Sequence, residues 1–232
     1  MVLGLLLCDH VRPGFQWLEG DYPDFFRRLF AGHPLELTSF DLPAGDFPVE
    51  LDRCDAWIIS GSRHSVYDRV AWVERLADLV RTFDRERRKL VGVCFGAQMI
   101  GHALGGVVAQ APQGWQVGTK EVVLNKKAPW MDPPAPRFRI LCSNADQVLV
   151  PPDRMRVLGS SPEIPVSVTA VDDHLVGFQG HPEFSVEYAA LLMEARRGTV
   201  IPDGTVDAGL ASLADGPDTD LLAGWIARFL LA

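Results

Sequence analysis

Four continuous apolar runs constrain the fold of this chain more than any other feature of its sequence. They occupy residues 2–8, 56–60, 90–94 and 175–179. Unbroken runs of this length are typical of strands with helices over both faces, because a strand with one wet face alternates apolar and polar residues. The sequence therefore predicts an α/β fold with an open, mostly parallel central sheet flanked by helices, as in flavodoxin-like and Rossmann-like proteins.

Helical periodicity fills much of the chain between these runs. Apolar side chains recur at three- and four-residue steps from about Val66 to Phe83, which predicts an amphipathic helix between the second and third strands. A strand, a helix and a strand in this order form a parallel crossover. Further helices are expected at 22–30, 96–104, 185–196 and 220–231, with a short one at 206–213.

The middle of the chain, residues 116–170, has a different pattern. Residues 116–124 alternate loosely like an exposed strand, and several prolines interrupt helix formation before the strands expected near 137–142 and 155–160. A small antiparallel patch is therefore expected in this region. No internal repeat or domain linker occurs, so residues 1–232 are interpreted as one domain, large enough to bury a sizeable core.

Charge and cysteine usage narrow the class of protein. The formal net charge of −8 would repel nucleic acid and anionic membranes, so a small polar substrate is expected. The apolar segment Met1 to Cys8 is too short to span a bilayer and lacks a basic leader. Cys8, Cys54, Cys94 and Cys142 lack metal-binding spacing, which argues against zinc and disulfides and predicts a cytoplasmic protein. No Walker glycine loop or G-x-G-x-x-G fingerprint occurs, so no cofactor is expected.

Cys94 is the candidate nucleophile. It stands between Gly92 and Gly96 at the end of an apolar run, and a helix-like stretch follows. The spacing G-x-C-x-G is the cysteine form of the nucleophile elbow, a strained turn that exposes the reactive atom. A helix that begins just after the cysteine aims its unpaired N–H groups at the sulfur and favours the thiolate. The alternative is a small buried residue at a strand end, since free cysteine often behaves as an ordinary core residue.

A second segment supplies a candidate base and a candidate carboxylate. His181 and Glu183 lie two residues apart, just after the last apolar run. A thiol nucleophile needs a base to accept its proton and a third group to orient the imidazole and stabilise its charged form. A cysteine with a histidine distant in sequence is the pattern expected of an intracellular thiol enzyme. Taken alone, this pair also fits a solvated loop.

These two segments resemble the class I glutamine amidotransferases, which carry a C-x-G-x-Q elbow and a distant H-P-E. The motifs in this chain read Cys94-Phe95-Gly96-Ala97-Gln98 and His181-Pro182-Glu183. The resemblance extends from the first strand to the final helix and is nearest to stand-alone, single-domain members, which include gamma-glutamyl peptidases and hydrolases. It implies one amidotransferase-like domain with a Cys94, His181 and Glu183 triad.

Two backbone N–H groups are expected to form an oxyanion hole. Acyl transfer through cysteine places negative charge on a carbonyl oxygen, and each aimed N–H lowers that barrier by about 3 kcal/mol. The N–H of Phe95 is one donor by its position after the nucleophile. The resemblance implies that Ser62 provides the other, in a loop where the family usually has Ser-Gly-Gly-Pro and this chain has Ser60-Gly61-Ser62-Arg63. The alternative is an ordinary polar loop at a strand end.

The resemblance also implies substrate-binding residues. Gln98 lies one helical turn beyond Cys94 and corresponds to the glutamine that the family uses to bind substrate glutamine. Gly61, Gln116 and Val117 are expected to contact the substrate too, the last two from the family's loop after the elbow helix. Asn144-Ala145-Asp146 stands where many relatives have His-Gly-Asp, which leaves Asp146 as a loop-capping residue.

Two further histidines compete for the role of base. His102 continues the elbow helix and is interpreted as packed against the sheet. His64 lies in the oxyanion loop, and its role is left open by the sequence.

The chemistry that follows is cleavage of a gamma-glutamyl amide, in glutamine or a gamma-glutamyl compound, through a Cys94 thioester. A glutaminase subunit that delivers ammonia to a separate synthetase is one alternative, because its chemistry is identical. A catalytically silent binding or regulatory module of the same fold is another, although a folded sheet does not require the three triad residues. The amine released, any synthetase partner and the oligomeric state are left open by the sequence.

Overall fold

A nine-stranded sheet forms the centre of the computed structural model, which describes residues 1–232. Its strand order is β2-β1-β3-β4-β11-β10-β9-β6-β7. The first five are parallel to one another: β2 (Glu36–Asp41), β1 (Val2–Leu7), β3 (Ala56–Ile59), β4 (Leu90–Val93) and β11 (Leu175–Phe178). The other four are antiparallel to their neighbours: β10 (Val168–Val171), β9 (Met155–Ser160), β6 (Gln116–Leu124) and β7 (Arg137–Asn144). A separate two-stranded sheet pairs β5 (Val107–Gln110) with β8 (Asp146–Val150).

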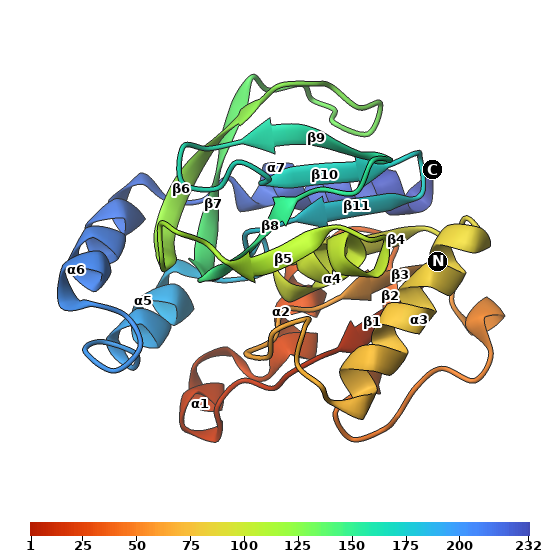
Figure 1. Ribbon diagram of the computed structural model, residues 1–232, viewed down its shortest axis with the longest axis horizontal. Coiled ribbons are helices and arrows are strands. Elements are labelled where there is room, and N and C mark those ends of the chain that lie inside the picture. Colours follow the sequence, from red (N-terminus) through yellow and green to blue (C-terminus); the bar gives the residue numbers. More distant parts are fainter.

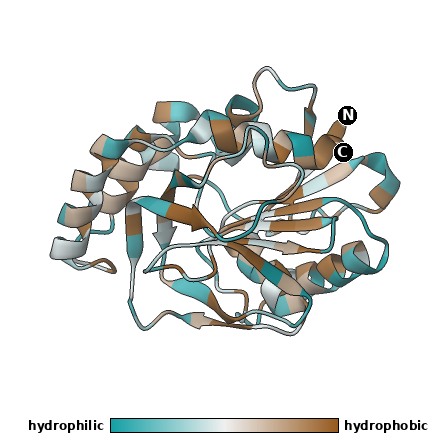
Figure 2. Ribbon diagram, turned by 90° about the horizontal axis from the view of Figure 1, so that it is seen from above, coloured by the Kyte–Doolittle hydropathy of each residue, from teal (hydrophilic) through white to brown (hydrophobic).

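Helices cover both faces of the main sheet (Figure 1). Their bounds are α1 (Gln16–Glu19), α2 (Tyr22–Leu29), α3 (Ala71–Arg85), α4 (Phe95–Ala103), α5 (Val186–Glu194), α6 (Asp203–Ser212) and α7 (Thr219–Leu231). Apolar side chains of α2 and α7 pack on one face of the parallel strands, and those of α3 and α4 pack on the other. Figure 2 shows hydrophobic strands in the middle of the molecule, between helices that carry both hydrophobic and hydrophilic residues.

This architecture confirms the predicted α/β fold with a mostly parallel central sheet and a small antiparallel part. The parallel strands have buried residues on both faces, as the unbroken apolar runs predicted; every residue of β3, β4 and β11 is buried. The antiparallel strands do not form a patch of their own, because they continue the main sheet beyond β11. No helix is long and apolar enough to cross a membrane.

Some boundaries and strands differ from the prediction. The helix predicted from Val66 begins instead at Ala71, because the Asp68 carboxylate accepts hydrogen bonds from the Ser65 N–H (3.1 Å) and from His64 Nδ1 (2.9 Å), which hold a turn there. Strands β2, β5, β8 and β10 were not predicted. Strand β2 lies at the sheet edge with only Phe40 buried, so it lacks the apolar run by which the other parallel strands were found.

Candidate active site

Cys94 occupies a strained turn between β4 and α4. Its φ is 50° and its ψ is −103°, a conformation that residues with a side chain rarely adopt. Added Cβ atoms show why glycines flank it. A Cβ on Gly96 would lie 2.6 Å from the Ile59 carbonyl oxygen, and one on Gly92 would lie 2.6 Å from the Ala97 nitrogen and closer still to the Gly96 carbonyl. The strand and the helix meet so closely at the elbow that neither glycine can carry a side chain without displacing backbone.

His181 and Glu183 lie beside Cys94 in the segment after β11. The His181 N–H donates to the Leu141 carbonyl (2.7 Å), which ties this segment to β7. His181 Nδ1 donates to Glu183 Oε1 (2.7 Å), and the imidazole stacks on the Phe184 ring at 3.9 Å. His181 and Cys94 both lie close to the buried Gly61: a Cβ added to that glycine would be 2.8 Å from His181 Cε1 and 3.8 Å from Cys94 Cβ. The structure therefore brings the three predicted side chains together, with His181 in the middle.

The charge state of His181 is set by its two partners. Burial of the ring lowers the pKa of His181, but the negative charges of Glu183 and Cys94, and hydrogen bonds to both, outweigh burial and raise the pKa above its ordinary value. The imidazole therefore holds its proton at neutral pH, where it can stabilise a thiolate on Cys94. Glu183 is buried, and its Oε2 has no hydrogen-bond partner, so the carboxylate acts on His181 through Oε1 alone.

The N–H groups of Phe95 and Ser62, the two predicted oxyanion donors, have no hydrogen-bond partner within the chain. Phe95 is the first residue of α4, so its N–H has no partner within the helix. The Ser62 N–H donates no hydrogen bond within the chain, and the Ser62 hydroxyl donates to the Cys8 carbonyl (2.9 Å), which anchors the loop after β3. The hydroxyl also accepts from the His64 N–H (3.1 Å). Both N–H groups are thus free to donate, and their role as an oxyanion hole stays a prediction.

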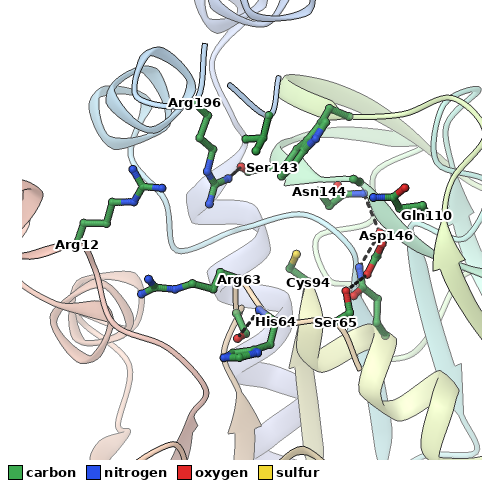
Figure 3. Close-up of a pocket in the computed structure, with 15 residues that line it drawn as sticks. Arg12, Arg63, His64, Ser65, Cys94, Gln110, Ser143, Asn144, Asp146 and Arg196 are labelled. Atoms are coloured by element: carbon green, nitrogen blue, oxygen red, sulfur yellow. Dashed lines mark hydrogen bonds between the residues drawn. The ribbon is translucent and has the colours of Figure 1, made fainter. Parts of the chain in front are cut away.

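A cavity of about 370 Å³ opens above Cys94 (Figure 3). Its lining comprises Cys94, Gln98, residues 62–65 and 143–146, and Arg12, Gln110, Trp115, Arg196 and Val200. Gln98 Nε2 donates to the Asp146 carbonyl (2.7 Å) and to Gln179 Oε1 (3.2 Å), so the side chain is fixed at the cavity wall. Gln98 therefore lines the cavity one helical turn beyond Cys94, and its contact with substrate stays a prediction.

Other predicted contact residues lie elsewhere. Gln116 and Val117 do not line the cavity. Gln116 is buried, with its amide against the carbonyls of Gln113 and Gly114, and Val117 packs with apolar side chains next to α5 and α6. Gly61 lies behind Cys94, against the imidazole of His181, and not at the cavity wall.

The two competing histidines have separate surroundings. His64 lines the active-site cavity, but its Nδ1 is paired with Asp68 Oδ2 (2.9 Å). His102 lines a different cavity beside Arg81, and burial together with that positive charge lowers the pKa of His102. Neither histidine is placed to take a proton from Cys94 as His181 is.

Several site residues were not predicted. Gln179 Nε2 donates to Cys94 Sγ (3.7 Å), and its position two residues before His181 was the only signal for it. Asp146 does not cap its own loop; its carboxylate accepts from the hydroxyls of Ser65 (2.6 Å) and Tyr67 (3.1 Å) in the loop after β3. Arg12 lies in the loop after β1, and Arg196 lies just after α5, at the end of the helix expected at 185–196; no motif linked either residue to the cavity.

The cysteines differ in their access to the cavity. All four are free thiols, and Cys94 alone lines the cavity. Burial raises the pKa of Cys8 and raises that of Cys142 to about 12, so both stay protonated. No group of three His, Cys, Asp or Glu side chains is arranged to hold a metal ion. The site therefore consists of the Cys94 sulfur at the cavity wall, with the buried imidazole of His181 and the buried carboxylate of Glu183 beside it.

Comparisons with known proteins identify the family of this chain. A family model described as glutamine amidotransferase class-I matches residues 31–193. Gamma-glutamyl peptidase 2 of Arabidopsis thaliana is 32% identical over 174 residues, which cover 72% of this chain and 70% of the relative. A glutamine-hydrolyzing GMP synthase of Thermus thermophilus is 30% identical and covers 70% of this chain but only 32% of its own length. The crystal structure of a glutamine amidotransferase from Thermotoga maritima has the same fold, with a TM-score of 0.79, 17% identity and 99% of each chain covered. This chain belongs to the class I glutamine amidotransferase family.

Proposed function

We propose that this protein hydrolyses the gamma-glutamyl amide bond of glutamine or of a gamma-glutamyl compound. One observation carries the proposal: the buried His181 imidazole is hydrogen-bonded to the Glu183 carboxylate and lies beside Cys94 at the elbow. A structural role for this trio would not require a strained φ of 50° at the cysteine, nor a charged pair buried against it. A catalytically silent module is therefore the weaker interpretation.

The reaction would proceed in two acyl-transfer steps. The Cys94 thiolate attacks the gamma-carbonyl carbon, and the oxyanion accepts hydrogen bonds from the N–H groups of Phe95 and Ser62. The C–N bond then breaks while His181 gives its proton to the departing amine, which leaves a thioester. Water attacks that thioester, His181 accepts a proton from it, and glutamate leaves. Glu183 stabilises the imidazolium in both steps.

The named relatives favour a stand-alone hydrolase over a synthetase subunit. Gamma-glutamyl peptidase 2 matches this chain over 70% of its own length, whereas the GMP synthase matches over 32%. The synthase relatives still support a second candidate, in which this chain supplies ammonia to a separate synthetase. Both candidates use the same triad, so only the fate of the amine distinguishes them.

The experiment is glutamate release from glutamine and from a panel of gamma-glutamyl amides, with the Cys94→Ala variant as control. We expect release from at least one bulky amide by the wild type and none by Cys94→Ala. Cleavage of glutamine that requires a co-expressed synthetase would support the subunit role. No release from any of these compounds by the wild type, under any of these conditions, would refute the hydrolase.

A further inference from the structure

Two arginines in the active-site cavity have no carboxylate partner. Arg12, in the loop after β1, and Arg196, just after α5, both line the cavity above Cys94, and neither forms an ion pair with any acidic side chain (Figure 3). Arg63, the third arginine at this cavity, is already paired with the Asp9 carboxylate through Nη2 at 2.6 Å. Arg12 and Arg196 thus bring two uncompensated positive charges to the site of a protein whose net charge is −8.

Arg196 is held in place although its charge is unpaired. Its Nη1 donates to Ser143 Oγ (2.9 Å), and its guanidinium lies 5.4 Å from the centre of the Trp115 ring. Burial lowers the pKa of Arg196, and the positive charge of nearby Arg12 also lowers it, against the opposing effects of Tyr22, Tyr188 and Cys94. Two like charges at one cavity, one of them on a partly buried side chain, cost free energy that a bound anion would recover.

The opposite wall of the cavity offers hydrogen-bond acceptors. Asp146 lies there, linked to Gln98 and Asn144 through its carbonyl oxygen and to the loop after β3 through its carboxylate. The Oδ1 atom of Asn144, a residue only 4% exposed, has no hydrogen-bond partner. The Asp146 carboxylate, held in place by Ser65 and Tyr67 at this wall, suits the α-ammonium of a gamma-glutamyl group. In Figure 3 Cys94 lies between this wall and the two arginines. When the gamma-carbonyl carbon of a substrate is bonded to Cys94, with its α-ammonium at this wall, the departing amine would therefore lie on the side of Arg12 and Arg196.

The geometry points to a carboxylate subsite for the leaving group, formed by Arg12 and Arg196, so that the favoured substrates release an amino acid or peptide and not ammonia. A guanidinium presents paired N–H donors that match the two oxygens of a carboxylate. This inference rests on the proposed hydrolase function. It adds no chemical step: the same C–N bond breaks, and the amine takes the same proton from His181.

The test compares two substrates that differ in one group, gamma-glutamylglycine and gamma-glutamylglycinamide. The wild type is expected to favour the carboxylate roughly tenfold or more in kcat/KM, the range of one charge-assisted hydrogen bond. Arg12→Gln and Arg196→Gln should each lower kcat/KM more for gamma-glutamylglycine than for the amide, and so reduce that preference. Arg53→Gln, at an exposed arginine outside the cavity, is the matched control.

The outcomes separate the two proposals. Hydrolysis of both substrates at equal kcat/KM, or equal losses on both in the arginine variants, would overturn the subsite and leave the hydrolase intact. No hydrolysis of either substrate, or of any other gamma-glutamyl amide, would overturn both. Because Arg196 contacts Trp115 and Ser143, its variant is checked by thermal unfolding; the exposed Arg12 variant tests the subsite even if Arg196→Gln fails to fold.

Discussion

Gly92→Ala is expected to distort the active site by forcing β4 and α4 apart. The new Cβ would lie 2.6 Å from the Ala97 nitrogen and closer to the Gly96 carbonyl, whereas ordinary van der Waals contact begins at 3.4 Å. The obstacles are backbone atoms and cannot rotate away, so β4 and α4 would have to separate by about 1 Å. Such overpacking costs about 1–3 kcal/mol of unfolding free energy, which for a chain of this length lowers the Tm by roughly 3–10 °C.

The same displacement carries Cys94 and the N–H of Phe95 away from the reacting carbonyl. A misplacement of about 1 Å can reduce a rate by about 100-fold. Thermal unfolding and glutamate release would be measured on Gly92→Ala and on Gly224→Ala, a matched control in α7 where a Cβ meets nothing within 4 Å. The control should gain about 0.5–1 kcal/mol from its higher helix propensity and keep its activity. Wild-type stability and turnover in Gly92→Ala would refute this account of the elbow.

Three further variants test the triad and the backbone. Glu183→Gln should slow glutamate release by roughly 100-fold or more. The pKa of His181 is raised in the folded chain, so its ion pair with Glu183 stabilises the fold fully below the ordinary histidine pKa of about 6.5. That stabilisation is lost as the pH rises through the raised pKa, so the Tm difference between this variant and the wild type should shrink toward alkaline pH. A difference that grows with pH would contradict that assignment. The free energy of unfolding in urea should be about 1 kcal/mol higher for Cys94→Gly than for Cys94→Ala, because glycine adopts a φ of 50° without strain. The reverse order of the two variants would show that the turn is not strained. Gly118→Ala should lower the unfolding free energy by about 1–3 kcal/mol, since φ is 78° and a Cβ would meet Ser212 Oγ and the Gly209 backbone, and an unchanged urea midpoint would argue against it.

The sequence predicted features that depend on short-range rules. The elbow needs only a strand end and glycines two residues on either side of Cys94, so its geometry is encoded within a few residues. His181 and Glu183 are likewise close enough in sequence for their spacing to be informative. The parallel strands were predicted because burial on both faces forces unbroken apolar runs.

Features that depend on tertiary packing were missed. Strand β2 is polar because it is an edge strand, which only the assembled sheet reveals. Val117 was assigned to the substrate by resemblance, but β6 turns its side chain toward α5 and α6, and Trp115 in the preceding loop reaches the cavity instead. Arg12 and Arg196 are brought together by loops that follow different elements, and no local pattern marks such a meeting.

The position of β11 has a consequence for the newly synthesised chain. Strand β11 lies between β4 and β10, and the Cys94 N–H donates to the Phe178 carbonyl at its end (2.8 Å). Until the ribosome has released that late segment, β4 lacks one of its two neighbouring strands and the thiol lacks its base. A prematurely terminated product that ends before β11 would therefore contain Cys94 without His181 and Glu183. The order of synthesis thus places the base and the carboxylate of the site long after the nucleophile.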